Sequence, residues 1–156
     1  MASQDVERTL VFLKPDAVQR GLVGELICRF ERKGLKLVAA KFMRIGRELA
    51  ERHYAVHKGK DFYPPLIDYV TSGPVMMLVL EAPEAVAIVR TMMGKTAGSE
   101  AAAGTIRGDL GISGRKNLIH GSDSPDTARH EIDLFFRPEE LLDYGRAIDA
   151  WIRTDG

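Results

Sequence analysis

The sequence predicts one domain of mixed α and β structure, because short apolar segments typical of strands alternate with longer segments of helical periodicity. Residues 1–156 suffice for a single domain with a sizeable core, and 45% of them are hydrophobic and 28% charged, as in globular proteins. The expected order is strand, helix, strand, helices, strand, helix, strand. That order is compatible with a split βαβ sandwich and with a doubly wound parallel sheet, and the pattern alone leaves both open.

The predicted strands are short and apolar. They span residues 9–13, 35–43, 75–80, 118–119 and 134–136. The first ends before Pro15, and the third follows a turn at residues 72–74. In the second, alternation assigns Leu35, Leu37 and Ala39 to one face and Val38, Ala40 and Phe42 to the other.

The predicted helices have apolar residues at intervals of three and four. They span residues 22–30, 47–56, 62–69, 83–93, 125–132 and 138–152. Gly34 follows the first as a C-terminal glycine, and Ser124 caps the helix that begins at Pro125. In the helix that Pro83 opens, the residues expected to face inward are Ala85, Val86, Ile88, Val89, Met92 and Met93.

Residues 94–116 interrupt the alternation with six glycines and little periodicity. A loop of this length in a compact domain is usually functional or disordered. Gly94-Lys95-Thr96 resembles the end of a phosphate-binding P-loop, but Val89 stands where that motif needs glycine, and a helix precedes it. We therefore reject a P-loop.

The charges balance over the whole chain but not along it. There are 22 basic and 22 acidic residues, of which 18 and 13 lie in residues 1–120 (18 − 13 = +5) and 4 and 9 in the remainder (4 − 9 = −5). No apolar segment approaches the ~18 residues of a membrane span, and residues 1–8 lack an apolar signal segment. We therefore expect a soluble protein. Because Cys28 is the only cysteine, we expect it in a reducing compartment, the cytoplasm.

Three of the four histidines carry little functional signal. His53 and His57 are four residues apart on a predicted helix, as paired metal ligands are, but no glutamate follows His53 and no third ligand is evident. We expect two surface histidines. His130, in a charged helix, is expected to be solvated, and Cys28, among apolar neighbours, to be a small core residue.

His120 is different, because it ends an apolar segment and precedes small, turn-forming residues that leave an imidazole open to approach. A core or capping histidine is equally compatible with that segment alone. Lys14 follows the first strand, Arg107 lies in the glycine-rich loop, and Glu131 follows His120 closely enough to fold back and orient the ring. A histidine with a carboxylate partner among Lys, Arg and glycine suits phosphoryl transfer through a covalent intermediate.

Five spaced motifs carry a resemblance. The most specific is Asn-Leu-Ile-His-Gly-Ser-Asp-Ser at 117–124; the others are Lys-Pro-Asp at 14–16, Ser-Gly-Pro-Val at 72–75, Gly-Thr-Ile-Arg-Gly-Asp at 104–109 and Arg-Pro-Glu-Glu-Leu at 137–141. In this order they resemble the nucleoside diphosphate kinase family along nearly the whole chain, from Arg8 to Ile152.

The resemblance implies a ping-pong kinase reaction. The histidine, here His120, takes the γ-phosphate of a nucleoside triphosphate, typically ATP, and passes it to a nucleoside diphosphate, with Mg²⁺ held mainly by the phosphates rather than by protein ligands. The implied catalytic residues are His120, Glu131, Ser122 and Lys14, of which Ser122 and Glu131 hold the histidine. The implied nucleotide-binding residues are Lys14, Tyr54, Arg90, Thr96, Arg107 and Asn117 for phosphate and ribose, with Phe62 and Leu66 around the base.

The resemblance also resolves the fold. It implies an α+β domain of the ferredoxin-like class, a split βαβ with a four-stranded antiparallel sheet and helices on one face. It further implies a homo-oligomer, a hexamer or a tetramer. From the residues themselves we expect no membrane partner and no nucleic acid as the primary partner.

This chain departs from the family pattern in two places. Ala97-Gly98 and Ala103 replace an Asn-Pro pair and a proline, so we expect a more mobile loop and a less secure hexamer. Gly114 and Arg115 replace a small apolar residue and a glycine, so we expect the far wall of the base pocket to differ in shape from the family pattern.

Two other functions compete with a kinase. A nucleic-acid-binding module would need exposed aromatic residues among basic ones on its strands, but only 7% of residues are aromatic, and Phe12 and Phe42 have apolar surroundings. A catalytically silent scaffold would be free to lose Lys14, Arg107 and His120. The balanced charge favours a small phosphorylated ligand over a polymer.

Overall fold

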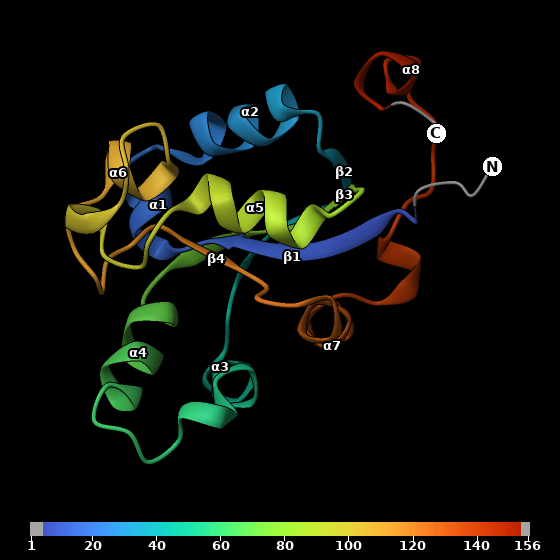
Figure 1. Cartoon of the computed structure of the whole chain (residues 1–156). Helices are drawn as coiled ribbons and strands as arrows, with labels where there is room; N and C mark the ends of the chain where they lie inside the picture. Colours follow the sequence, from blue (N-terminus) through green and yellow to red (C-terminus); the bar gives the residue numbers. More distant parts are fainter. Residues whose placement is uncertain (1–4, 154–156) are drawn as a thin grey trace.

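The computed structural model describes residues 5–153. Its centre is a four-stranded antiparallel sheet in the order β2-β3-β1-β4, made of β1 (Glu7–Leu13), β2 (Lys36–Arg44), β3 (Pro74–Ala82) and β4 (Ile119–Gly121). α2 (Val23–Lys33) lies between β1 and β2 along the chain, and α5 (Ala85–Met93) between β3 and β4 (Figure 1). This split βαβ order confirms the ferredoxin-like α+β prediction and excludes the doubly wound parallel sheet.

Helices cover both faces of the sheet, not one as expected. Besides α2 and α5, the α-helices are α1 (Pro15–Gln19), α3 (Arg47–His53), α4 (Tyr63–Val70), α6 (Ile106–Leu110), α7 (Pro125–Phe135) and α8 (Asp149–Ile152). One core joins the sheet to α3, α4 and α7, and a second core joins it to α1, α2, α5 and α6 (Figure 1). The sheet therefore has two buried faces.

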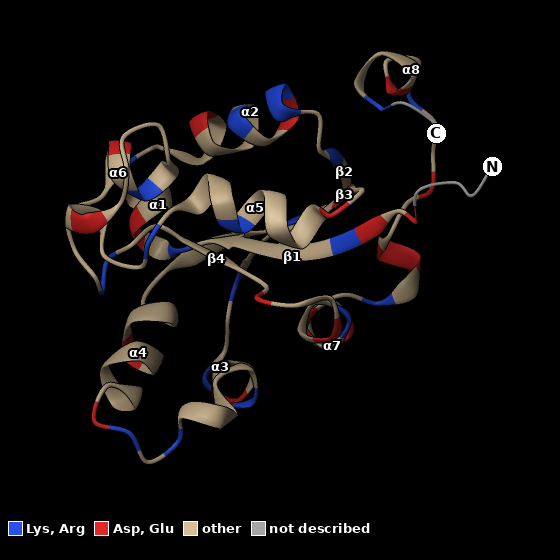
Figure 2. Ribbon diagram, in the orientation of Figure 1, with Lys and Arg blue, Asp and Glu red and all other residues tan. Residues whose placement is uncertain are grey.

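β1 shows how the sequence encodes this arrangement. Residues 10–13 are all fully buried, because β1 lies inside the sheet and both of its faces are covered. Leu10 and Phe12 belong to the core of α3, α4 and α7, and Val11 and Leu13 to the opposite core. Figure 2 shows the charged residues of β1 confined to its start. A continuous apolar segment is what such a strand requires.

The side chains of β2 are not distributed between the two faces of the sheet as the sequence predicted. A β-bulge between Leu37 and Ala39 shifts the register, so Val38 and Ala39 both enter the same core. The alternation after the bulge is inverted, and Phe42 is 59% exposed on an edge strand. Phe42 therefore lacks the apolar surroundings that the sequence suggested, whereas Phe12 is fully buried as expected.

Several predicted boundaries are wrong for local reasons. α5 begins at Ala85, because Glu84 before it is left-handed (φ 55°). The glycine-rich segment is not one loop, since it contains a 3-10 turn at Gly98–Glu100 and α6. Residues 134–136 do not form a strand, because α7 continues to Phe135. Cys28 is half-buried rather than a core residue.

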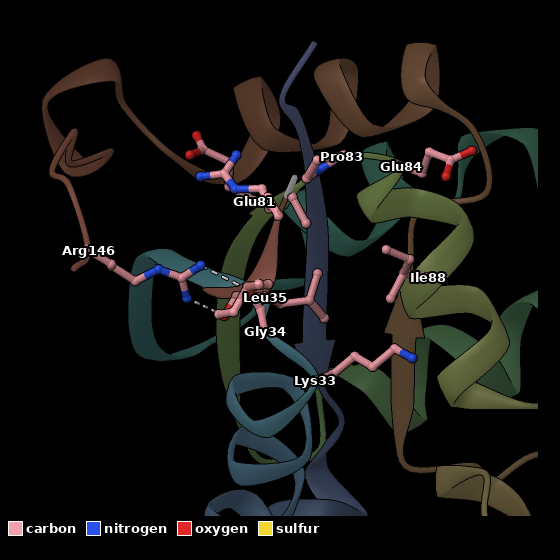
Figure 3. Close-up of a pocket in the computed structure, with 11 residues that line it drawn as sticks. Lys33, Gly34, Leu35, Glu81, Pro83, Glu84, Ile88 and Arg146 are labelled. Carbon is pink, nitrogen blue, oxygen red and sulfur yellow. Dashed lines mark hydrogen bonds between the residues drawn. The ribbon is translucent and has the colours of Figure 1, made fainter. Parts of the chain in front are cut away.

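The long C-terminal helix predicted at 138–152 is absent. The chain instead forms a 3-10 turn at Pro138–Glu140, continues irregularly and ends in the short α8. Hydrogen bonds to a neighbouring segment replace helical ones: Tyr144 donates to the Leu37 carbonyl, and Arg146 donates to the carbonyls of Gly34 and Leu35 at 2.9 and 3.3 Å. Figure 3 shows these Arg146 contacts at a cavity of about 280 Å³.

No helix among residues 5–153 is long and apolar enough to cross a membrane.

Candidate functional site

His120 lies at the middle of β4, paired with Phe12 of β1. The two rings stack at 4.8 Å between centroids, and the His120 side chain keeps 20% of its surface exposed. The chain turns sharply just before it, where Leu118 is left-handed (φ 72°). The strand and the stacking partner therefore fix the ring while one edge stays accessible.

Glu131, on α7, holds one nitrogen of this ring. Its two carboxylate oxygens lie 3.1 and 3.0 Å from His120 Nε2. Ser122 donates from Oγ to Glu131 Oε1 at 2.5 Å, and the Leu10 N–H donates to Ser122 Oγ. The Ser124 hydroxyl caps α7 by accepting from the Thr127 N–H, which fixes the helix that carries Glu131.

These contacts decide the charge on Glu131. Burial alone would raise the pKa of the carboxyl, but the hydrogen bonds from His120 and Ser122 outweigh it and the pKa is lowered. An ionised carboxylate only accepts hydrogen bonds, so the contact with Glu131 requires a proton on His120 Nε2. The neutral ring then has its lone pair on Nδ1, for which the described chain provides no hydrogen-bond partner.

His53 corrects the expectation of a surface histidine. Its side chain is 3% exposed and packs edge-on against His120, with centroids 4.7 Å apart. Burial, followed by the proximity of His120, lowers the pKa of His53 to about 3, so the ring is neutral. The sequence held a signal for this burial: Ala50, three residues earlier on the same helix face, is also buried.

His57 and His130 fit the expectation better. His57 is half-buried beside Phe62, with ring centroids 5.1 Å apart, and His130 is exposed.

A cavity of about 550 Å³ lies against His120, and we call it the Lys14 cavity. Its lining residues are Lys14, Tyr54, His57, Phe62, Pro65, Leu66, Tyr69, Thr96, Arg107, Gly114, Arg115, Lys116, Asn117 and His120. Four of these are Lys or Arg, and none of the described lining residues is acidic. The cavity is therefore suited to an anion.

Lys14 is a deeply buried cation of this cavity. Its Nζ donates to Asn117 Oδ1 at 2.7 Å, and only 7% of the residue is exposed. Burial, followed by the positive charge of Arg107, lowers the pKa of Lys14 to about 8. Nearby, Asp16 accepts from the Leu118 N–H and from the Tyr69 hydroxyl, which ties the Lys-Pro-Asp turn to the segment before β4. An anion in the cavity would offset the cost of this buried charge.

Arg107 holds the glycine-rich segment to β4. Three of its nitrogens donate to main-chain carbonyls, those of Asn117 at 3.1 Å, Ile119 at 2.7 Å and Gly94 at 3.3 Å. Burial, followed by the charge of Arg90, lowers the pKa of Arg107 to about 10. A guanidinium has five N–H groups, so two remain for a ligand.

The lining of the cavity also includes apolar and aromatic side chains. Tyr54 is buried, Leu66 is half-buried, and Phe62 is 43% exposed where α4 begins. Burial raises the pKa of the Tyr54 hydroxyl. A flat hydrophobic group can lie between these side chains while its charged part faces Lys14 and Arg107.

The structure brings together nearly every residue that the sequence singled out. Thr96 is exposed at the cavity rim, and its carbonyl accepts from the Asn117 amide at 3.2 Å. Arg90 does not line the Lys14 cavity; it is exposed beside a neighbouring cavity and donates to the Gly121 carbonyl at 3.4 Å. The lining residues that the sequence did not reveal are His57, Pro65 and Tyr69. None has a distinctive motif, and only the packing of α4 brings Pro65 and Tyr69 to the site.

Comparison with known proteins adds an independent observation. A family model described as "Nucleoside diphosphate kinase" matches residues 7–141. Curated proteins named nucleoside diphosphate kinase from Listeria monocytogenes serotype 4b and from Thermomicrobium roseum are each 57% identical over 147 residues, 94% of this chain and 100% and 99% of theirs.

Solved structures agree with the sequence relatives. A halophilic nucleoside diphosphate kinase from Halobacterium salinarum in complex with CDP superimposes with a TM-score of 0.94 at 50% identity, covering 96% of this chain and 100% of that one. A nucleoside diphosphate kinase family protein from Babesia bovis superimposes with a TM-score of 0.91 at 46% identity, covering 94% and 99%.

Proposed function

The chain belongs to the nucleoside diphosphate kinase family, and from that membership we propose that the Lys14 cavity is its active site, with His120 as the residue that carries the phosphate. The protein is a phosphotransferase that moves the γ-phosphate of a nucleoside triphosphate to a nucleoside diphosphate by a ping-pong mechanism through a phosphohistidine.

One observation carries the assignment of His120. Its Nε2 is held by both oxygens of Glu131, and the ring lines a cavity rich in cations. The Nδ1 lone pair forms a bond to the γ-phosphorus while the bond from that phosphorus to the bridging oxygen breaks, and the diphosphate leaves with the electron pair. Ionised Glu131 stabilises the positive charge that develops on the ring, and Ser122 keeps Glu131 in place. A second diphosphate then reverses the step.

The cations of the cavity are proposed to bind the phosphates of the nucleotide. Lys14, fixed by Asn117, and Arg107, fixed by carbonyls, are rigid donors for phosphate oxygens. Their positions do not have to reorganise when charge develops on the transferred group. Thr96 and Tyr54 are proposed to contact phosphate or ribose, and Arg90 does so from the neighbouring cavity.

The base is proposed to stack between Phe62 and Leu66. Stacking on an aromatic face is tolerant of base identity, which suits an enzyme that accepts many nucleotides. The relative from Halobacterium salinarum has been solved with CDP, which supports a nucleotide ligand at this fold. Gly114 and Arg115 line the same cavity and are the positions where the base pocket differs from the family pattern.

The cofactor is proposed to be Mg²⁺. The described residues that line the Lys14 cavity offer no carboxylate, so the ion fits there only when the nucleotide phosphates supply its ligands. When bound it neutralises phosphate charge during transfer.

Further features of the molecule are proposed from the sequence and the surface. Residues 1–156 act as one domain. The domain forms a homo-oligomer that is a hexamer or a tetramer. Exposed apolar side chains such as Phe42 (59% exposed) and Trp151 (91% exposed) are candidates for subunit contacts. A cytoplasmic location is supported by the lone, half-buried Cys28.

Initial-rate kinetics test the proposal. With ATP varied at several fixed concentrations of dTDP, a ping-pong enzyme gives parallel double-reciprocal lines. His120→Asn is expected to abolish the exchange. Intersecting lines, or full activity of His120→Asn, would contradict the assignment.

A further inference from the structure

His53, His120 and Glu131 converge on one point although they come from three different elements, α3, β4 and α7. One ligand atom of each lies within 4.8 Å of the other two. Glu131 Oε2 is 3.0 Å from His120 Nε2 and 3.4 Å from His53 Nδ1. The reaction proposed above uses His120 and Glu131 but gives His53 no task.

His53 Nδ1 is the unexplained atom of this cluster. It is fully buried and makes no hydrogen bond, on a side chain that is 3% exposed. A buried polar atom without a partner costs about 1–3 kcal/mol, and such atoms are rare in folded proteins. This one lies beside a carboxylate oxygen and a second imidazole, which are ligand types for a transition metal.

Two of the three spacings in this cluster suit a small tetrahedral ion. With bonds of 2.0–2.1 Å, two ligands of a tetrahedral zinc ion lie about 3.3 Å apart. The distances of 3.0 and 3.4 Å from Glu131 to the two histidines are close to that value.

The cluster also borders a cavity from which an ion can enter. All three side chains line a second cavity of about 610 Å³, which we call the Arg52 cavity and which includes the carboxylates of Asp123 and Asp126. Water from this cavity can complete the coordination. Of the three ligand residues, only His120 also lines the Lys14 cavity.

We propose that His53 Nδ1, His120 Nε2 and a carboxylate oxygen of Glu131 form an inhibitory Zn²⁺ site entered from the Arg52 cavity. Mg²⁺ does not compete, because it prefers six oxygen ligands. Two imidazoles and one carboxylate with an open position instead suit zinc.

The ion would act through the tautomer of His120. A neutral imidazole carries one proton, and zinc on Nε2 displaces that proton to Nδ1. Nδ1 then has no lone pair for the γ-phosphorus, so the phosphohistidine cannot form. No proton is lost overall, Glu131 exchanges a hydrogen bond for a coordinate bond, and removal of zinc by a chelator restores the original tautomer.

Direct binding tests the site without reference to catalysis. Calorimetric titration of the nucleotide-free enzyme with Zn²⁺ should show one site per chain. His53→Phe keeps a neutral aromatic ring in the packed position and removes the ligand, so it should weaken binding at least about 100-fold. His130→Gln, which removes an exposed histidine of the same cavity, should bind like the wild type.

His53→Asn guards against a folding defect in the Phe variant; it should also weaken binding, while its circular dichroism remains that of the wild type. The site is overturned if the wild type binds no Zn²⁺. It is also overturned if folded His53→Phe and His53→Asn bind Zn²⁺ as tightly as the wild type does.

The inhibitory effect of Zn²⁺ rests on the proposed role of His120, and it is measured separately from Zn²⁺ binding. Buffered Zn²⁺ should block phosphohistidine formation in the wild type. His53→Phe should be at least about tenfold less sensitive to Zn²⁺ than the wild type. Each protein is compared with its own metal-free rate. A wild type that binds Zn²⁺ through His53 but is still labelled overturns the inhibitory role. A protein that is never labelled, even without zinc, contradicts the proposed function and leaves the calorimetric result standing.

Discussion

Both carboxylate oxygens of Glu131 lie within 3.1 Å of His120 Nε2, so a single side chain fixes the tautomer of the histidine and leaves Nδ1 as its lone-pair nitrogen. Glu131 is itself buried and held by Ser122, which prevents it from moving away from the ring. The chemistry proposed for the site depends on this relationship more than on any other.

Glu131→Gln tests the relationship. A neutral amide cannot stabilise the positive charge that develops on the ring, and it can present its NH₂ to Nε2, which favours the wrong tautomer. We expect kcat to fall about 10–100-fold with little change in KM for the nucleotide. Asp133→Asn, an exposed carboxylate on the same helix, is the matched control and should behave as the wild type. An unchanged kcat in Glu131→Gln would contradict the assigned role.

His53 predicts a specific acid sensitivity. Its pKa is about 3 in the folded chain against an ordinary value of 6.5, so the unfolded chain binds a proton below pH 6.5 while the folded chain does not. Its contribution to stability is complete above pH 6.5 and is lost as the pH falls from 6.5 toward 3. The free energy of unfolding should fall by up to about 1.4 kcal/mol per pH unit from this group.

Urea denaturation between pH 7 and 5 measures that slope. His53→Phe should have a shallower slope than the wild type, because phenylalanine does not titrate. Identical slopes would show that His53 is protonated in the folded protein.

Lys14 predicts that nucleotide binding weakens in mild alkali. The pKa of Lys14 is lowered to about 8, so its charge is lost in the free enzyme as the pH rises through 8. The Kd for ADP, measured by calorimetry, should therefore rise between pH 7 and 9, by up to about tenfold. Lys14→Met should bind more weakly at pH 7 and lack this dependence, whereas Lys95→Met, which removes an exposed lysine, should retain it. A Kd that is constant over this range in the wild type would exclude a titrating lysine at the phosphates.

The glycine-rich segment provides a paired test of packing. A Cβ at Gly98 would lie 2.2 Å from the Gly111 carbonyl oxygen, whereas a Cβ at Gly114 would meet only Ala97, at 3.7 Å. Gly98→Ala should therefore lower the free energy of unfolding by about 1–3 kcal/mol and weaken nucleotide binding, and Gly114→Ala should be tolerated. Equal stability of the two variants would mean that this segment has no fixed packing. The mobility expected from Ala97-Gly98 remains a prediction.

Much of the fold follows from local sequence. The residues of β1, the Gly34 end of α2 and the Ser124 cap of α7 are all encoded by neighbours in the chain, and the structure confirms each. The C-terminal segment is different. Its apolar spacing suggests a helix, but Tyr144 and Arg146 bond instead to carbonyls about 110 residues away in sequence, a long-range effect that periodicity does not contain.

The site divides in the same way. His120, Glu131, Lys14 and Arg107 could be selected because each has a chemical reason to be reactive, and all lie at or beside one cavity. For His53 the sequence held only the apolar Ala50 on the same helix face, and its contact with His120 depends on how α3 packs against the sheet.

Phosphorus NMR of the phosphorylated enzyme tests the central claim most directly. After incubation with ATP and Mg²⁺ and removal of nucleotide, the spectrum distinguishes phosphate on Nδ1 from phosphate on Nε2 of a histidine. Because Glu131 occupies Nε2, we predict a single phosphohistidine with phosphate on Nδ1, absent from His120→Asn. Phosphate on Nε2, or a signal that persists in His120→Asn, would contradict the account.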